Sequence, residues 1–252
     1  MAQKIIISGC NGKMGQVVEN ICLADPDITV VAGFDLSSAH RSYPVFSNSS
    51  NFTGDADVVI DFSNPAALDG LLQFCTERHT PLVLATTGFS PAQLDAVEEA
   101  SKVIPIFRSA NMSLGINVLL ELVKKAAAIL GDSYDIEIVE KHHNRKVDAP
   151  SGTALMIADA AASALNFDAE YVYDRHSVRQ SRDKKEIGIS SVRGGTIVGE
   201  HEIMFAGRDE VIEIKHTAMS REIFANGAVK AAKFLAAGCK PGMYDMSMLV
   251  QE

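Results

Sequence analysis

Short apolar runs alternate with amphipathic segments along the first half of the chain. Two of the segments between runs begin with Asn64-Pro65 and Ser90-Pro91, where a capping side chain precedes a proline, the favoured start of a helix. Buried strands that alternate with helices predict a parallel sheet covered on both faces. The predicted strands are 4–8, 28–34, 57–62, 81–86 and 103–108.

The pattern changes after about Asn111. The later strands follow one another without helices between them, so we expect a mostly antiparallel second sheet. The predicted fold is α/β, with a Rossmann-like parallel-sheet domain (1–111 and 222–252) and an inserted α+β domain (112–221). The predicted helices are 115–130, 152–165 and 222–237, and the predicted strands are 134–141, 186–193, 196–206 and 210–217.

Composition restricts the class of protein. The chain has 252 residues, 47% of them hydrophobic, which is typical of a packed globular protein. Apolar runs are too short for a membrane span or a signal peptide, so we expect a cytoplasmic protein. The formal net charge of −9 repels nucleic acid on average. The four scattered cysteines form no C-x-x-C pair, which argues against a disulfide scaffold or structural zinc.

A glycine-rich loop follows the first predicted strand. Glycines allow a tight turn and close approach to a pyrophosphate, and the next helix presents free N–H groups to it. The spacing G-x-x-G-x-x-G is less specific than G-x-G-x-x-G, but Asp35 lies 20 positions past Gly15, where a carboxylate binds ribose. A dinucleotide site is predicted; a turn that binds nothing and a solvated Lys13 are the alternatives. The loop reads Gly9-Cys10-Asn11-Gly12-Lys13-Met14-Gly15.

Two further loops follow predicted strands of the same sheet. Ligands bind at the carboxyl ends of the strands in open α/β sheets, so both loops fit a cofactor cleft. Each alone is weak evidence, because turns of this composition are common. The residues are Thr86, Thr87 and Gly88 after one strand, and Ser109, Ala110, Asn111 and Met112 after the next.

A basic, histidine-rich segment lies in the second half of the chain. Five of the six residues at 141–146 are Lys, Arg or His, which indicates an anionic partner in an otherwise acidic chain. The helix start at 150–153 presents N–H groups that suit a carboxylate. A lysine and a helix start acting on one ligand indicate a small molecule with two acidic groups.

The histidines of this segment suit proton transfer near neutral pH. On an extended segment His142 and His143 point in opposite directions, so they need not share a role. Three alternatives stay open: a solvated run of charge, a core histidine satisfied by hydrogen bonds, and a zinc site of His142, His143 and Asp148 with unusual spacing.

The longest motif resembles one enzyme family. The run EKHHNRKVDAPSGTA is similar to the signature E-x-HH-x-x-K-x-DAPSGTA of 4-hydroxy-tetrahydrodipicolinate (dihydrodipicolinate) reductases. The resemblance extends over essentially the whole chain. The other similar segments are GCNGKMG, DFSNP, TTGFS, ANMSLGIN, VRGGTIVGEHEIMFAG, SREIFANGAV and GMYDMSML.

The resemblance implies an activity and a set of residue roles. The family transfers hydride from NADH or NADPH to a cyclic dicarboxylate, giving tetrahydrodipicolinate for lysine biosynthesis by the diaminopimelate route. By motif position, His142 is the proton donor and Lys146 the second catalytic residue, while His143, Gly152 and Thr153 bind substrate. No metal is expected. The implied cofactor-binding residues are Gly9, Cys10, Asn11, Gly12, Lys13, Met14, Asp35, Thr86, Thr87, Gly88, Ala110, Asn111 and Met112.

The resemblance also implies a homotetramer, paired through the sheet of the 112–221 domain, which would bind substrate as well. The chain departs from the family near the cofactor: the segment after Asp35 is shorter than in many members, and Leu36 stands where members that use NADPH well often have a basic residue. Ala85 also replaces a frequent glycine. We expect use of both cofactors with a modest NADH preference, because Asp35 repels an added phosphate while Lys13 and Arg41 offset part of that repulsion.

Other classes of protein explain the sequence less well. Aspartate or diaminopimelate dehydrogenases share the two-domain layout, but not the HH-x-x-K and DAPSGTA segments. A nicotinamide-sensing regulator that binds DNA would need a helix-turn-helix with a basic face, and none is evident. A scaffolding protein would leave the glycine loop and the histidine cluster without a role.

Overall fold

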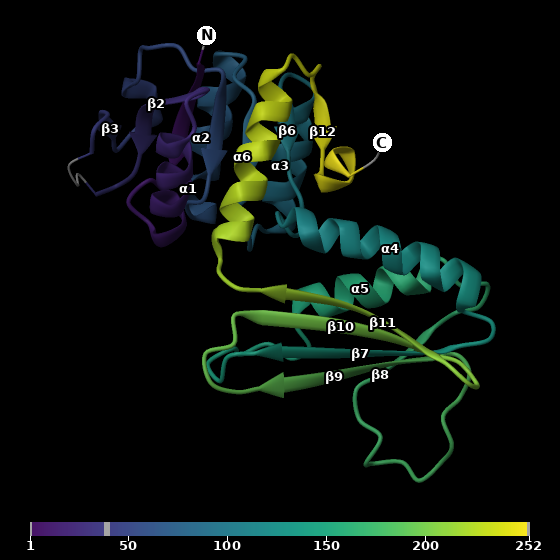
Figure 1. The fold of residues 1–252 in the computed structure, drawn as a ribbon. Helices are drawn as coiled ribbons and strands as arrows, with labels where there is room; N and C mark the ends of the chain where they lie inside the picture. Colours follow the sequence, from purple (N-terminus) through teal and green to yellow (C-terminus); the bar gives the residue numbers. More distant parts are fainter. Residues whose placement is uncertain (1, 38–40, 251–252) are drawn as a thin grey trace. The chain divides into compact units, whose positions relative to one another are not determined.

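The computed structural model describes residues 2–37 and 41–250 and divides into two compact units (Figure 1). The first unit runs to Leu114 and resumes at Arg221, and the second comprises Gly115–Ser220. Within the described residues, no helix is both long and apolar enough to cross a membrane.

The first unit contains a seven-stranded sheet in the order β12-β6-β5-β4-β1-β2-β3. Every pairing in it is parallel, which confirms the predicted Rossmann-like sheet. The edge strands β3 and β12 were not predicted, because two or three residues carry no usable periodicity. The strands are β1 (Gln3–Ser8), β2 (Ile28–Phe34), β3 (Val45–Phe46), β4 (Val58–Asp61), β5 (Leu82–Leu84), β6 (Pro105–Phe107) and β12 (Gly242–Tyr244).

Helices cover both faces of this sheet. In β1, Ile5 and Ile7 pack into one apolar cluster with α1 and α6, and Ile6 between them packs into a second cluster with α2 and α3. Strands buried on both faces must be apolar throughout, which explains the continuous runs in the sequence. The elements are α1 (Lys13–Ala24), α2 (Leu68–Glu77), α3 (Pro91–Ser101) and α6 (Glu222–Ala236), with 3-10 turns η1 (Ser49–Asn51), η2 (Pro65–Ala67) and η3 (Met246–Leu249).

The second unit contains a five-stranded sheet in the order β11-β10-β7-β9-β8. The expectation of a mostly antiparallel sheet is wrong: β7 pairs with β9, and β9 with β8, in parallel, while only the β10 pairings are antiparallel. The successive strands β9 and β10 form no hairpin, because they pair with opposite edges of β7. The strands are β7 (Asp135–His142), β8 (Glu170–Val172), β9 (Glu186–Arg193), β10 (Gly199–Ala206) and β11 (Val211–Ala218).

One face of this second sheet is covered by α4 (Leu114–Leu130) and α5 (Gly152–Ala162). On β7 the covered face begins with Ile136 and Ile138, which belong to the apolar core. The period of two continues this row to Glu140 and His142, which are also buried. These two buried polar residues lie where the apolar core ends, which makes their surroundings a candidate functional site.

Candidate active site

The glycine loop of the first unit packs too closely for side chains at two positions. Gly9 has φ +77°, and a Cβ on it would lie 2.6 Å from the carbonyl oxygen of Phe62. A Cβ on Gly15 would lie 2.1 Å from the carbonyl oxygen of Gly9. The loop therefore has the tight turn and the close approach of helix α1 that the glycines predicted, and it presents bare backbone.

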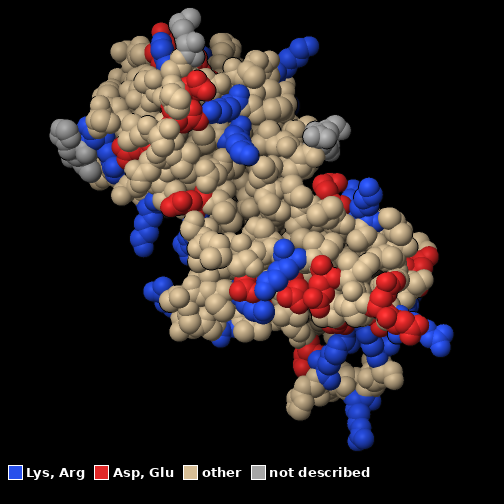
Figure 2. Space-filling model, viewed as in Figure 1, with Lys and Arg blue, Asp and Glu red and all other residues tan. Residues whose placement is uncertain are grey.

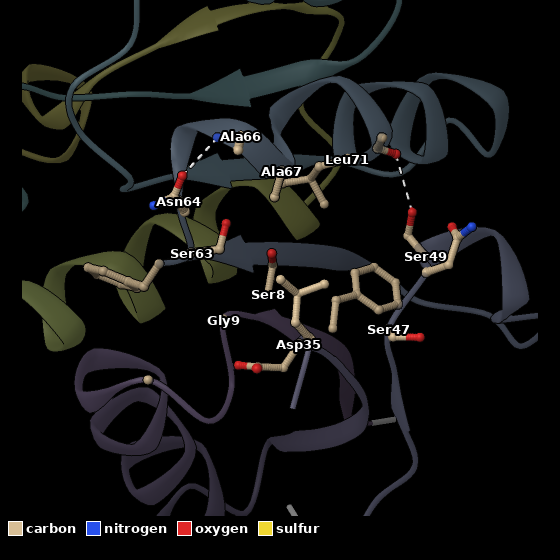
Figure 3. A pocket seen from close by; sticks show the side chains of 16 residues that line it. Ser8, Gly9, Asp35, Ser47, Ser49, Ser63, Asn64, Ala66, Ala67 and Leu71 are labelled. Atoms are coloured by element: carbon tan, nitrogen blue, oxygen red, sulfur yellow. Dashed lines mark hydrogen bonds between the residues drawn. The ribbon is translucent and has the colours of Figure 1, made fainter. Parts of the chain in front are cut away.

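A cavity of about 520 Å³ opens beside this loop, at the carboxyl ends of β1, β2 and β4. In Figure 3 the side chains of Ser8, Asp35 and Ser63 lie around it on the side of the glycine loop. A concave site with bare backbone, hydroxyl groups and one carboxylate fits the adenosine half of a dinucleotide. The described lining residues are Ser8, Gly9, Gly12, Phe34, Asp35, Leu36, Ser47, Asn48, Ser49, Phe62, Ser63, Asn64, Ala66, Ala67, Gly70 and Leu71.

Two backbone amides hold the Asp35 carboxylate at the cavity wall. Its Oδ2 accepts a hydrogen bond from the Asn11 amide at 2.9 Å, and its Oδ1 accepts one from the Ser37 amide at 2.9 Å. The Asn11 side chain donates to the Ser37 hydroxyl at 2.8 Å and so ties the loop after β2 to the glycine loop. Asp35 is thus a fixed hydrogen-bond acceptor at the cavity wall.

The structure gives less direct support for the other predicted cofactor residues. The Cys10 side chain is part of the core, and burial together with the nearby Asp35 raises its pKa to about 11, so only its backbone is available to a ligand. Met14 is half-buried against the same core. The segments 86–88 and 110–112 follow β5 and β6 as predicted, but neither is among the described residues that line the cavity.

The sequence reading missed Asp61, a buried carboxyl at the carboxyl end of β4. Burial raises its pKa, although the Ser63 hydroxyl donates to its Oδ1 at 2.6 Å and favours the charged form. The available signal was an aspartate at the end of a predicted buried strand. Asp61 anchors Ser63, which lines the cavity, and thereby shapes the floor of the site.

A second cluster of polar groups surrounds the fully buried Glu140 on β7. Arg193 on β9 donates to both of its oxygens, at 2.6 and 2.8 Å, and the Ser151 amide donates to Oε1 at 3.1 Å. The Nδ1 atom of His142 lies 2.5 Å from Oε2. Burial alone would raise the pKa of Glu140, but hydrogen bonds from Arg193 and then His142 lower it to about 2. Glu140 is therefore a carboxylate at neutral pH.

The charge of Glu140 determines which His142 nitrogen carries hydrogen. A carboxylate only accepts, so Nδ1 must donate to it, and Nε2 is left as the other reactive atom. A Cβ on Gly199 would lie 3.1 Å from Nε2, so the ring packs closely against this glycine and a side chain there would crowd it. His142 is buried and hydrogen-bonded, as the core-histidine alternative predicts. Its Nε2 atom, which Glu140 does not bind, is the one that could transfer a proton.

His201 on β10 lies opposite Glu140 in the register of the sheet and is also buried. Its Nε2 lies 2.9 Å from the Ser151 hydroxyl, and its ring centroid lies 5.1 Å from that of His142. Burial, with a contribution from the neighbouring His142, lowers the pKa of His201 to about 4. His201 is therefore neutral at pH 7, and it supports Ser151, which caps helix α5.

This lowered pKa predicts acid sensitivity of the fold. The unfolded chain takes up a proton at His201 near pH 6.5, whereas the folded chain takes it up only near pH 4. The unfolded state then binds more protons, so the free energy of unfolding should fall by up to about 3 kcal/mol between pH 7 and 4. Urea unfolding across this range measures it. His201→Gln should flatten the slope, leaving the parts due to His216, whose pKa burial also lowers, and to Glu140, whose lowered pKa adds to the loss near pH 4. An unchanged slope would contradict the assignment.

The predicted substrate residues come from one continuous stretch of the second unit. His143 follows the end of β7, and a turn closed by the Lys146 amide and the His143 carbonyl leads to Lys146. The Lys146 ammonium lies 2.9 Å from Asp148, and this contact lowers the pKa of Asp148. Gly152 and Thr153 are the first residues of α5. In the described part of the chain, no group of three or more His, Cys, Asp or Glu is placed to hold a metal ion.

Comparisons with known proteins give the same family over both halves of the chain. The family model described as dihydrodipicolinate reductase, N-terminus, matches residues 3–112, and its C-terminal counterpart matches residues 115–250. A 4-hydroxy-tetrahydrodipicolinate reductase of Caldanaerobacter subterraneus is 56% identical over 252 residues, which is all of both chains. The enzyme of the same name from Clostridium tetani is 50% identical, over 98% of this chain and 96% of its own.

Solved structures share the fold. Dipicolinate-bound dihydrodipicolinate reductase from Paenisporosarcina sp. TG-14 has a TM-score of 0.81 at 24% identity, covering 97% of this chain and 98% of its own. A diaminopimelate dehydrogenase from C. glutamicum has a TM-score of 0.58 at 15% identity, covering 97% and 92%. At such identities the likeness shows the arrangement of the elements alone.

Proposed function

The chain belongs to the dihydrodipicolinate reductase family, and on that premise we propose that His142 and Lys146 carry out the chemistry of its reaction. The activity is that of an NAD(P)H-dependent 4-hydroxy-tetrahydrodipicolinate reductase of lysine biosynthesis. The single observation that carries the proposed roles is the buried Glu140 carboxylate, which fixes Nδ1 of His142 and leaves Nε2 available.

His142 serves as the proton donor. When bound, the reduced nicotinamide supplies the hydride. Conversion of the 4-hydroxy substrate to tetrahydrodipicolinate also releases water, which leaves a ring double bond; hydride adds to one of its carbons, and the other needs a proton. Nε2 of His142 can deliver that proton because the orientation of the imidazole is already set by Glu140. The buried carboxylate also stabilises the charged ring before the proton leaves, as the orienting carboxylate does in other histidine-based sites.

Lys146, His143 and the start of α5 bind the carboxylates of the substrate. Lys146 is already paired with Asp148, which is 59% exposed in its side chain, so a substrate carboxylate can replace that partner at little cost. Gly152 and Thr153 begin α5, where the positive end of the helix dipole favours a second carboxylate. The structure of the Paenisporosarcina protein was determined with dipicolinate, a ligand of this class.

Lys146→Ala is expected to lower kcat/KM at least tenfold and to weaken inhibition by dipicolinate, because charge-assisted hydrogen bonds contribute about 1.5–3 kcal/mol. Initial rates over a dipicolinate series measure both effects. Lys141→Ala is the matched control: Lys141 belongs to the same basic segment, but it pairs with Glu200 instead, and its variant should stay within about threefold of wild type. Undiminished inhibition of the Lys146 variant would show that this lysine binds no carboxylate.

The cofactor binds to the first unit, with its ribose on Asp35 and its pyrophosphate on the backbone of the glycine loop. The fit rests on Gly9 and Gly12, which line the cavity, and on the two amides that fix the Asp35 carboxylate. The segments 86–88 and 110–112 would hold the rest of the cofactor, because they follow β5 and β6 at the carboxyl ends of the same sheet. NADH and NADPH oxidation with freshly generated substrate tests the function, and absence of turnover with both cofactors would overturn it.

The two units correspond to two domains, with residues 1–111 and 222–252 for the nucleotide and residues 112–221 for the substrate and for tetramerisation. On the sheet of the second unit, Lys141 and Lys215 both pair with Glu200, while Val192 and Val211 are exposed. Such a mixed surface suits self-association into a cytoplasmic homotetramer, which light scattering would test. In Figure 2, acidic side chains lie beside many of the Lys and Arg side chains, except at the lower end of this view, where Lys and Arg gather. The formal net charge of −9 does not favour a nucleic-acid partner.

A further inference from the structure

We propose that Glu19 is a specificity-determining residue, because it holds Arg41 away from the position that a 2′-phosphate of the cofactor would occupy. The inference rests on the proposed cofactor site and adds the reason for a preference between its two forms. Glu19 lies on α1 and Arg41 lies in the segment after β2, so the two residues come from different elements around the glycine loop.

All three nitrogen atoms of the Arg41 guanidinium are engaged. One terminal nitrogen lies 2.5 Å from Glu19 Oε2, Nε donates to the Asn11 side chain at 2.9 Å, and the other terminal nitrogen donates to the Cys10 carbonyl at 3.3 Å. The side chains of Arg41 and Glu19 are only 17% and 8% exposed. The guanidinium is thus bound in a fixed orientation with its charge directed at Glu19.

Asp35, beside which a 2′-phosphate would lie, shares Asn11 as a neighbour with Arg41 but lines the cavity without it. The amide of Asn11, a residue that Arg41 contacts, donates to Asp35, the carboxylate that would accept the ribose hydroxyl. Among the described residues that line the cavity, Asp35 is the only charged one, and neither Arg41 nor Lys13 is present. Among the described residues, a 2′-phosphate at this wall would therefore face a carboxylate and no cation that lines the cavity.

Arg41 cannot leave Glu19 without a large penalty. Its departure would leave a nearly buried carboxylate unpaired, and this loss exceeds what one partly exposed ion pair with a phosphate returns. This changes the expectation drawn from the sequence, in which Arg41 offset the repulsion from Asp35. The wild-type protein should therefore favour NADH, with Glu19 contributing to that preference at a distance from the ribose.

Glu19→Gln tests the proposal, because it keeps the shape of the side chain and removes its charge. Arg41 then loses its ionic partner, and the affinity for NADP⁺ relative to NAD⁺ should rise about 3- to 10-fold, measured by calorimetry on the purified protein. The ratio of kcat/KM for NADPH and NADH should rise in parallel, and both gains should shrink in high salt. Glu19→Asp, which loosens the pair but keeps the charge, should give an intermediate ratio.

The double variant Glu19→Gln/Arg41→Met is the matched control, since it replaces the ion pair with two neutral side chains. Its cofactor ratio should return to the wild-type value, because the gain depends on Arg41. An unchanged ratio in both Glu19 single variants, or a gain that persists in the double variant, would overturn the inference. Wild-type protein that bound neither nucleotide would instead overturn the cofactor site itself.

Discussion

Replacement of His142 by glutamine is expected to lower kcat by about 10²- to 10⁴-fold, with a much smaller change in KM for the substrate. Glu140 holds Nδ1 of the ring, so Nε2 is the atom left to deliver a proton. Glutamine is similar in polarity but cannot transfer a proton at neutral pH. Steady-state kinetics at saturating cofactor measure kcat and KM separately.

His143→Gln is the informative control for this variant. His143 is adjacent in sequence, but it lies beyond the end of β7 and is proposed to bind substrate, so its replacement should raise KM more than it lowers kcat. The two variants carry the same substitution at adjacent positions, so the difference between their kcat and KM values separates proton transfer from substrate binding. A His142 variant whose turnover stayed within about threefold of wild type would remove this residue from the chemistry.

The first sheet was predictable because its signal is local. Continuous apolar runs, and caps such as Asn64 and Ser90, are each contained in a few neighbouring residues, and both caps form the predicted hydrogen bonds. The second sheet was only half predictable. Its long strands were found, but their order in the sheet depends on which strand pairs with each edge of β7. The sequence of β9 and β10 carries no local sign that they pair on opposite sides of a third strand.

The residues of the candidate active site were also only partly predictable from the sequence. His142 and Lys146 stand out by residue type and spacing, and Glu140 could have been included, because residues two apart on a strand share a face. Arg193 could not have been found. It meets Glu140 only because β9 pairs with β7 in a register that puts Arg193 beside His142, 51 positions earlier in the chain. The Glu19–Arg41 pair is likewise formed between separate elements.

Arg193→Met is expected to lower the free energy of unfolding by about 3–5 kcal/mol, because it removes the permanently charged partner of the fully buried Glu140 carboxylate. Turnover should fall as well, by about 10- to 100-fold, since the carboxylate that orients His142 loses two of its hydrogen bonds. Urea unfolding gives the first effect and kcat gives the second. A loss of less than about 1 kcal/mol would mean that the pair is not needed for stability.

The double variant Glu140→Gln/Arg193→Met separates the two roles of Glu140. With both partners neutral no buried charge is left unpaired, so most of the lost stability should return. Turnover should not return, because an amide is not charged, and it neither fixes the Nδ1 hydrogen of His142 nor stabilises the protonated ring as a carboxylate does. If kcat recovered together with stability, Glu140 would be only a structural partner of Arg193. Recovery of stability alone identifies it as the residue that positions His142 for proton transfer.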